Sequence, residues 1–315
     1  MTIFLSESDV VDLLDMPGAI DALEKGFKEK SAGTAVNLSR VRPEANGVGL
    51  TMMVSVLGGM SVSGFKVMGA GKPLVLLYGG ESKTLLAIIE ASSLGQRRTG
   101  AASGLATKYM ASGKASTVGI VGTGFQARSQ LEAICNVRNI EVIKAFSRNQ
   151  DRRKEFAAIM SEFLRIDVIA VDSAEEALKG TDIVVAITNV RTLDPVVLGE
   201  WIKPGAHINA AGANSLSRRE LDETAILRSA MIAVDDLDQA KIECADLVMA
   251  VDSGIAMWDQ IVELSDIVSG DLRVPIDNER LTLFESQGIA LEDISVAAYI
   301  YEKAILSGIG ETLSF

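Results

Sequence analysis

The sequence predicts an α/β protein that combines a doubly wound parallel sheet with a smaller α+β domain. At 315 residues the chain exceeds the size at which a single hydrophobic core usually stops growing, so two domains are expected. From about Val36 to Tyr78, short apolar segments are separated by glycines, which is typical of antiparallel strands. From Ser116 onward, apolar strands alternate with helices, which indicates a parallel sheet covered on both faces.

The first domain is predicted to begin and end with helices. Apolar residues recur at helical spacing over the first 30 residues, and Ser6 or Ser8 can cap the first turn. After the antiparallel strands, segment 85–111 is predicted to form a strand and then a helix rich in small residues. Segment 291–308 is predicted to be a closing helix, whose apolar stripe could pack on either domain.

Six strands are predicted for the parallel sheet. They lie in "TVGIVG", "EVIKAFS", "DVIAVD", "DIVVAIT", "HINAAGA" and "MIAVDD", and the last is expected to complete the sheet.

Composition excludes several classes of protein. With 30 basic and 42 acidic residues the net charge is -12, so we expect no binding to nucleic acid or to anionic membranes. Apolar stretches are too short to span a bilayer, and the acidic N-terminus does not resemble a signal peptide. Cys135 and Cys244 lack the spacing of a metal or redox motif. We therefore expect a cytoplasmic protein with reduced thiols and no metal site.

A glycine-rich turn follows the strand at "TVGIVG". Gly122 permits a tight turn, Gly124 lets the backbone approach a pyrophosphate, and Ala127 keeps helix and strand close. The pattern is weak alone, but here it follows a strand and opens a helix, whose N-terminal N–H groups can bind phosphate. It predicts a Rossmann-type dinucleotide site made by Gly122, Thr123, Gly124, Phe125, Gln126 and Ala127.

The end of the second strand, "AFSRNQDRR", indicates which dinucleotide binds. NAD sites usually place an acidic residue there to accept from the ribose 2′-hydroxyl. This chain has Ser147, Arg148 and Asn149, which suit a 2′-phosphate, with Arg148 able to bind it as a fork. NADP(H) is therefore favoured over NAD(H), although Asp151 could reach a ribose instead.

A nicotinamide enzyme also needs a group that handles protons. His207 is the only histidine, and its strand context favours a structural role, which disfavours a histidine-based hydroxy-acid dehydrogenase. Lys66 in "VSGFKVMG" points away from its apolar neighbours Phe65 and Val67. If that direction is inward, burial lowers its pKa and suits it to proton transfer; otherwise it is an ordinary solvent-exposed lysine.

Arginines near this lysine could hold a substrate carboxylate. Arg40 and Arg42 alternate in "LSRVRP" and so face the same way, while Arg97 and Arg98 lie at the start of a helix. Guanidinium groups bind carboxylates in a bidentate manner, but each arginine alone could also be a surface residue.

Several blocks resemble the ornithine cyclodeaminase/mu-crystallin family. They are "GFKVMG", "RRTGAASGLATKYMA", "VGIVGTGFQA", "TNVRTLDPVVLGEWIKPGAHINAAGAN", "RRELDE" and "LTLFESQGIALEDISVAAYIYEKA", in order from about residue 36 to 304. The resemblance implies a homodimer. It also implies a substrate-binding and dimerisation domain of residues 1–112 and 291–315, and a dinucleotide-binding domain of residues 113–290.

The resemblance also assigns site residues. Lys66 matches the active-site lysine, and Arg98 matches the arginine that binds the substrate carboxylate, with Arg42 or Arg40 as its companion. Thr188 and Asn189 lie where the nicotinamide half of the cofactor usually runs.

One departure from the family concerns Asn214. Cyclodeaminases carry at this position an aspartate that acts as acid and base, whereas an amide exchanges no proton at neutral pH and can only hydrogen-bond the substrate. This disfavours cyclisation of ornithine and suits a one-step reduction in which Lys66 handles the protons.

We therefore expect an NADPH-dependent reductase that converts a small cyclic ketimine or 2-imino carboxylate into an L-amino acid. Δ1-Pyrroline-2-carboxylate and Δ1-piperideine-2-carboxylate are examples of such substrates. The alternatives are an ornithine cyclodeaminase, an alanine dehydrogenase, or a non-catalytic NADPH-binding protein like mu-crystallin.

Overall fold

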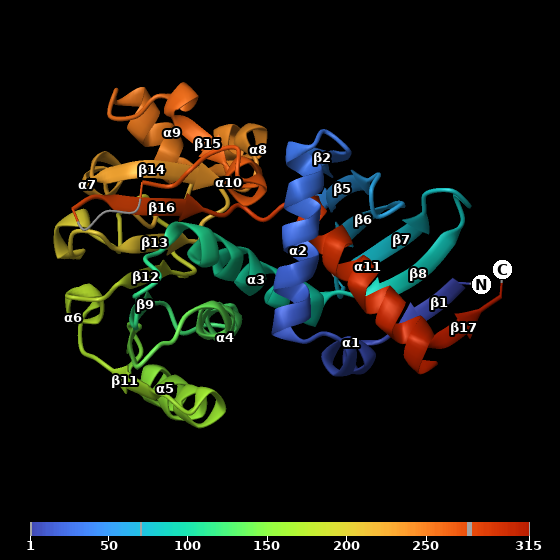
Figure 1. Ribbon diagram of the computed structural model, residues 1–315, viewed down its shortest axis with the longest axis horizontal. Helices are drawn as coiled ribbons and strands as arrows, with labels where there is room; N and C mark the ends of the chain where they lie inside the picture. Colours follow the sequence, from blue (N-terminus) through green and yellow to red (C-terminus); the bar gives the residue numbers. More distant parts are fainter. Residues whose placement is uncertain (1, 70, 276–278, 315) are drawn as a thin grey trace. The chain divides into compact units, whose positions relative to one another are not determined.

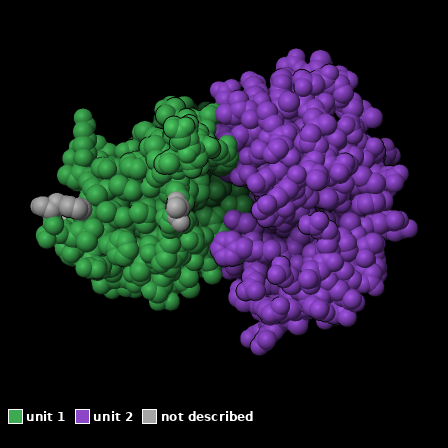
Figure 2. All heavy atoms as spheres, turned by 180° about the vertical axis from the view of Figure 1, so that it is seen from behind, with its two compact units in different colours: residues 1–102, 289–315 green, residues 103–288 purple. Residues whose placement is uncertain are grey.

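The computed structural model describes residues 2–69, 71–275 and 279–314 and divides into two compact units. Unit 1 comprises residues 1–102 and 289–315, and unit 2 comprises residues 103–288 (Figure 2). The first boundary falls inside helix α3 (Ser92–Met110), whereas the sequence placed it after residue 112. The second lies between residues 288 and 289, close to the predicted position after residue 290.

Unit 1 is built on a seven-stranded sheet with the order β17-β1-β8-β7-β6-β5-β2. The strands are β1 (Thr2–Leu5), β2 (Ala35–Val41), β5 (Thr51–Leu57), β6 (Val62–Met68), β7 (Leu74–Gly79), β8 (Leu85–Glu90) and β17 (Glu311–Leu313). Strands β2, β5, β6 and β7 pair antiparallel in the segment predicted to do so, and β8 pairs antiparallel with β7. Two short strands, β3 (Glu44–Ala45) and β4 (Val48–Gly49), pair with each other.

The helices of unit 1 include α1 (Glu7–Leu13), α2 (Met16–Ser31) and α11 (Ala290–Ser307). Helix α11 packs on β5, β6 and β7 and against α2 (Figure 1). The two helices approach closely because Gly26 of α2 has no side chain: a Cβ there would lie 2.2 Å from Ser295 Oγ of α11. The closing helix predicted from the sequence therefore packs within unit 1.

The prediction that the first 30 residues are helical was wrong for residues 2–5. These residues form β1, which pairs parallel with β8 and antiparallel with β17. Ser6 then starts α1, because its hydroxyl accepts from Asp9 N while the Asp9 carboxylate accepts from Ser6 N. Both partners of β1 are distant in sequence, so local periodicity did not reveal it.

Unit 2 contains an eight-stranded sheet with the order β11-β10-β9-β12-β13-β16-β14-β15, in which every neighbouring pair is parallel. The strands are β9 (Thr117–Val121), β10 (Val142–Phe146), β11 (Asp167–Ala170), β12 (Ile183–Ala186), β13 (His207–Ala210), β14 (Ser229–Val234), β15 (Ile261–Glu263) and β16 (Leu281–Glu285). The helices are α4 (Ala127–Val137), α5 (Gln150–Leu164), α6 (Ala174–Leu178), α7 (Glu223–Leu227), α8 (Leu237–Glu243), α9 (Ala245–Asp252) and α10 (Leu264–Ser269). This is the predicted doubly wound architecture.

The expectation that "MIAVDD" completes the parallel sheet was wrong. Strand β16 inserts between β13 and β14, and β15 extends the far edge. The order reverses at β9, since β10 lies on one side of it and β12 on the other. In open sheets of this kind, ligands bind at the carboxyl ends of the strands beside such a reversal.

In the part of the chain that the structure describes, every helix is too short or too polar to cross a bilayer.

Candidate functional site

Lys66 lies on the face of the unit 1 sheet that α11 covers. Alternate residues of β6 point to this face, and the Lys66 side chain is 4% exposed. Its Nζ donates a hydrogen bond to Asp293 Oδ1 at 2.9 Å. Space for the ammonium group comes from Gly95 in α3, since a Cβ there would lie 2.8 Å from Lys66 Nζ. The lysine therefore points inward, the condition under which the sequence suggested a role in proton transfer.

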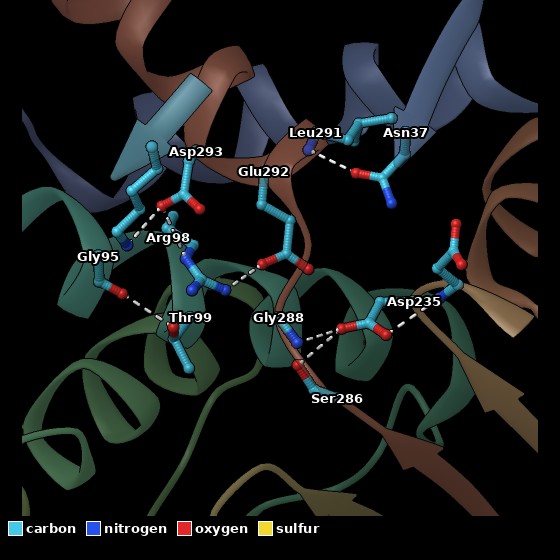
Figure 3. A network of polar contacts seen from close by, with 12 residues as sticks. Asn37, Gly95, Arg98, Thr99, Asp235, Ser286, Gly288, Leu291, Glu292 and Asp293 are labelled. Carbon is cyan, nitrogen blue, oxygen red and sulfur yellow. Dashed lines mark hydrogen bonds and ion pairs between the residues drawn. The ribbon is translucent and has the colours of Figure 1, made fainter. Parts of the chain in front are cut away.

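Two carboxylates from the first turn of α11 complete this group, and neither was predicted from the sequence. Arg98 donates from Nη1 to Glu292 Oε2 at 2.5 Å and from Nε to Asp293 Oδ1 at 3.2 Å (Figure 3). Asp293 thus accepts from both Lys66 and Arg98. Both acids are completely buried. Two adjacent acids in the first turn of a largely apolar helix were the signal that could have found them.

The start of α11 is anchored by a residue of β2. Asn37 Oδ1 accepts a hydrogen bond from Leu291 N at 3.1 Å (Figure 3). This bond satisfies an N–H group in the first turn of the helix. It therefore helps to fix the turn that carries Glu292 and Asp293.

A shift of register in β2 brings Arg40 to the same face. Leu38 pairs with Val54 and Val41 with Met52, so β2 contains one more residue than β5 over this interval. Such a bulge reverses the alternation. Arg40 is accordingly 8% exposed, and its charge acts on both Lys66 and Asp293. Arg42 is exposed and lies just beyond the end of β2.

The charges of this cluster suit an anionic ligand. Three basic side chains, Lys66, Arg40 and Arg98, lie with two acids, Glu292 and Asp293, in this cluster. Burial lowers the pKa of Lys66 below its ordinary value, although the charge of Asp293 opposes this effect. Burial would raise the pKa of Asp293, but the charges of Arg98 and Lys66 outweigh it and hold that pKa low. A cluster with three basic side chains offers donors that suit a carboxylate ligand.

The glycine turn of unit 2 lies at the carboxyl end of β9. Gly122 has φ +111°, its N–H donates to Phe146 O at 2.8 Å, and a Cβ there would lie 2.2 Å from Ile187 O. At Gly124 an added Cβ would meet no described atom within 4 Å, so this backbone is open to a ligand. Ala127 is fully buried where α4 begins. The turn therefore has the local geometry expected for a pyrophosphate.

The remaining residues of the turn leave hydrogen-bonding groups available. Gln126 occupies the N-cap of α4 without a side-chain bond to the helix, and within the described ranges its buried Oε1 has no hydrogen-bond partner. Phe125 is 61% exposed. Thr123 Oγ1 donates to Ser147 Oγ at 2.8 Å, which joins the turn to the end of β10. The helix N-terminus without a side-chain cap is the feature here that fits the phosphates of a dinucleotide.

Ser147, Arg148 and Asn149 follow β10 as predicted. Arg148 is exposed, whereas the Asn149 side chain caps α5 by accepting from Arg152 N at 2.9 Å. Asn149 Oδ1 is engaged in this cap, and Arg148 is the basic side chain among residues 147–149 and is exposed to an anionic ligand.

Thr188, Asn189 and Asn214 follow β12 and β13 in unit 2, where Asn189 is exposed and Asn214 half-buried. Glu220, which the sequence analysis did not single out, connects these segments. Its Oε1 accepts from both N and Oγ1 of Thr188 at 2.6 Å, and its Oε2 accepts from Gly212 N at 2.7 Å. The loops at the carboxyl ends of two neighbouring strands are thus held by one buried carboxylate.

His207 is fully buried in β13, with Nδ1 2.9 Å from Thr282 Oγ1. Burial lowers the pKa of His207 to about 3, so the ring is uncharged at neutral pH. This agrees with the structural role predicted for it.

Comparison with known proteins identifies the family. The model of the ornithine cyclodeaminase/mu-crystallin family matches residues 1–308. A Δ1-pyrroline-2-carboxylate reductase of Bacillus cereus is 33% identical over 325 residues, covering 99% of this chain and 99% of that protein.

Two solved structures are similar over the whole chain. The Δ1-pyrroline-2-carboxylate reductase of Thermococcus litoralis, in complex with NADH and L-proline, superposes with a TM-score of 0.93 at 34% identity, covering 99% of this chain and 100% of that one. An archaeal alanine dehydrogenase dimer with bound NAD gives a TM-score of 0.91 at 32% identity, covering 100% and 99%. This chain therefore belongs to the ornithine cyclodeaminase/mu-crystallin family.

Proposed function

We propose that this chain is an NAD(P)H-dependent oxidoreductase that reduces the C=N bond of a small cyclic ketimine or 2-imino carboxylate to give an L-amino acid. The observation that carries the proposal is a buried lysine that lies with two arginines and two acids: Lys66, Arg40, Arg98, Glu292 and Asp293. Similarity to two Δ1-pyrroline-2-carboxylate reductases supports the reaction class.

Residues of unit 1 bind the substrate and supply a proton to it. Arg40 and Arg98 bind the substrate carboxylate, because guanidinium groups match its geometry. The ammonium group of Lys66 transfers a proton to the imine nitrogen, which makes the adjacent carbon electrophilic toward hydride; the lysine is left neutral and regains a proton from water. Asp293 stabilises the ammonium form of Lys66 against the effect of burial. Arg42, exposed beyond β2, is the less suitable companion for Arg98.

Unit 2 holds the dinucleotide, whose nicotinamide supplies the hydride when bound. The backbone from Gly122 to Ala127 would bind the pyrophosphate, and Thr188 and Asn189 the nicotinamide half. Asn214 would hydrogen-bond the substrate without exchanging a proton, which argues against cyclisation of ornithine.

We further propose a preference for NADP(H), bound through its 2′-phosphate by Arg148 with Ser147 and Asn149 beside it. Support comes from the exposed guanidinium of Arg148 and from the lack of an acidic side chain at positions 147–149. The two similar structures contain NADH and NAD, so the preference is to be measured with both coenzymes.

The active form is proposed to be a homodimer. The sheet face turned away from α11 carries an apolar row across neighbouring strands, made by Leu38, Val54, Phe65, Leu76 and Ile88, all exposed or half-buried. A second copy of the chain would cover this row. The similar archaeal alanine dehydrogenase is a dimer. Size-exclusion chromatography with light scattering tests the assembly.

An absorbance assay tests the reaction. NADPH or NADH is supplied with Δ1-pyrroline-2-carboxylate, with Δ1-piperideine-2-carboxylate, or with pyruvate and ammonia, and NAD with ornithine is tested separately. We expect turnover with a cyclic imino acid, lost in Lys66→Ala and retained in Lys72→Ala, which alters an exposed lysine of the same unit. Turnover only with pyruvate and ammonia would identify an alanine dehydrogenase. Coenzyme binding without turnover would identify a binding protein.

A further inference from the structure

Glu220 has no role in the reaction proposed above. It is 1% exposed, yet its carboxylate accepts three hydrogen bonds from two separate loops. Two come from Thr188, which follows β12, and one comes from Gly212, which follows β13. A buried carboxylate that accepts from three donors connects the loops strongly, since hydrogen bonds to charged groups are stronger than those between neutral groups.

The backbone of Glu220 is itself fixed on two sides. Its N–H donates to Asp246 Oδ1 at 3.1 Å, at the start of α9. Its carbonyl oxygen accepts from Val196 N and Val197 N, both at 2.9 Å. The side chain therefore extends from a rigid base and can impose a position on the two loops.

Gly212 shows how closely the loops are joined. A Cβ at Gly212 would lie 2.5 Å from Glu220 Oε1 and 2.5 Å from both N and O of Thr188. Only a residue without a side chain permits this approach. The contact between the two loops thus depends both on the carboxylate of Glu220 and on the absence of a side chain at Gly212.

We propose that Glu220 is a positioning residue for the dinucleotide. It holds the loops after β12 and β13 in the arrangement that receives the nicotinamide end. This inference rests on the proposed function, because Thr188 and Asn189 are assigned there to the nicotinamide half. The carboxylate accepts from all three donors, whereas a hydrogen on Oε2 would face the N–H of Gly212, and a hydrogen on Oε1 would require the Thr188 hydroxyl to turn and accept; protonation therefore weakens the connection between the loops.

The groups around Glu220 predict a dependence on pH. Burial raises the pKa of Glu220 to about 7, the charge of Asp246 in α9 adds to this effect, and the hydrogen bonds from Thr188 and Gly212 oppose it. Glu285 at the end of β16 also faces Glu220, and Arg219 faces Asp246. Acidification through about pH 7 should therefore protonate Glu220 and weaken dinucleotide binding.

The experiment compares Glu220→Gln with Glu200→Gln, which removes an exposed carboxylate from the same unit. In Glu220→Gln the amide NH₂ would face either the backbone N–H of Gly212 or that of Thr188. We expect the Kd for NADPH and NADH to rise about tenfold or more, with the KM for the imino acid changed less than threefold. Binding by wild type should weaken from pH 8 to pH 6, and this slope should vanish in Glu220→Gln.

Gly212→Ala provides a second test that keeps the charge of Glu220, and it should weaken dinucleotide binding in the same way. If Glu220→Gln does not fold, Gly212→Ala and the pH series of the wild type decide the question. The inference would be overturned if Glu220→Gln bound the dinucleotide as tightly as wild type. It would also be overturned if Gly212→Ala bound it as tightly as wild type and the affinity of the wild type did not change between pH 8 and pH 6. Failure of the wild type to bind either coenzyme would instead overturn the proposed function and the inference with it.

Discussion

Replacing Asp293 by asparagine tests how the proposed site keeps Lys66 protonated. Asp293 is fully buried, and its Oδ1 accepts from Lys66 Nζ at 2.9 Å and from Arg98 Nε at 3.2 Å. Asparagine has nearly the same volume, so the main change is the loss of charge. That charge raises the pKa of Lys66 against the effect of burial. Without it, a larger fraction of Lys66 is neutral at any given pH.

The size of the effect follows from the contact that is weakened. A hydrogen bond to a charged group contributes about 1.5–3 kcal/mol, so kcat/KM for the imino acid should fall about 10- to 100-fold at neutral pH. The loss of activity on the alkaline side should also begin at lower pH than in wild type, because a lysine with a lower pKa deprotonates earlier. Acidification should therefore restore part of the activity.

The assay is a pH series of kcat/KM followed by NAD(P)H absorbance, with thermal unfolding to show that the variant folds. Glu302→Gln is the matched control, since it removes an exposed carboxylate from the same helix. If Asp293→Asn keeps kcat/KM within threefold of wild type and its alkaline limb does not move, the proposed role of Asp293 is refuted.

Three further substitutions test other parts of the structure. Arg148→Gln should reduce the ratio of NADPH to NADH efficiency by about tenfold, and equal losses with both coenzymes would argue against a 2′-phosphate contact. Gly26→Ala should lower the free energy of unfolding by about 1–3 kcal/mol in denaturant titration, because its Cβ would overlap Ser295 Oγ; no change would contradict this packing. Asp15→Ala should lower the free energy of unfolding by about 0.5–2 kcal/mol, because the cap of α2 is lost. Hydrogen bonds hold the pKa of Asp15 at about 2 in the folded protein. The difference in stability between wild type and variant should therefore diminish as the pH falls from about 4 toward 2.

Local patterns in the sequence were sufficient to predict much of unit 2 and part of unit 1. The turn from Gly122 to Ala127 was recognisable because the strand, the glycines and the helix lie within a few residues of one another. Alternation along β6 likewise set Lys66 apart from Phe65 and Val67. These features depend on backbone geometry that neighbouring residues impose, so they can be predicted from a single segment of the sequence.

The partners of Lys66 depended on contacts between distant segments. Asp293 is separated from it by 227 residues, and no periodicity in β6 indicates which helix will cover that strand. Arg40 was expected to face the same way as Arg42. The shift of register against β5 turns Arg40 inward, whereas β2 ends at Val41, so the alternation does not extend to the exposed Arg42. A bulge depends on the pairing of two strands, which neither strand encodes alone.

The sequence by itself determined the two kinds of architecture, the glycine turn and the family to which the chain belongs. Tertiary structure alone decided the insertion of β16 between β13 and β14, the pairing of Asp293 and Glu292 with Lys66 and Arg98, and the bridge that Glu220 forms between two loops. The physical reason is that propensities and periodicities act over a turn or a strand. Buried charges, in contrast, are stabilised by whichever partners the completed fold brings within hydrogen-bonding distance.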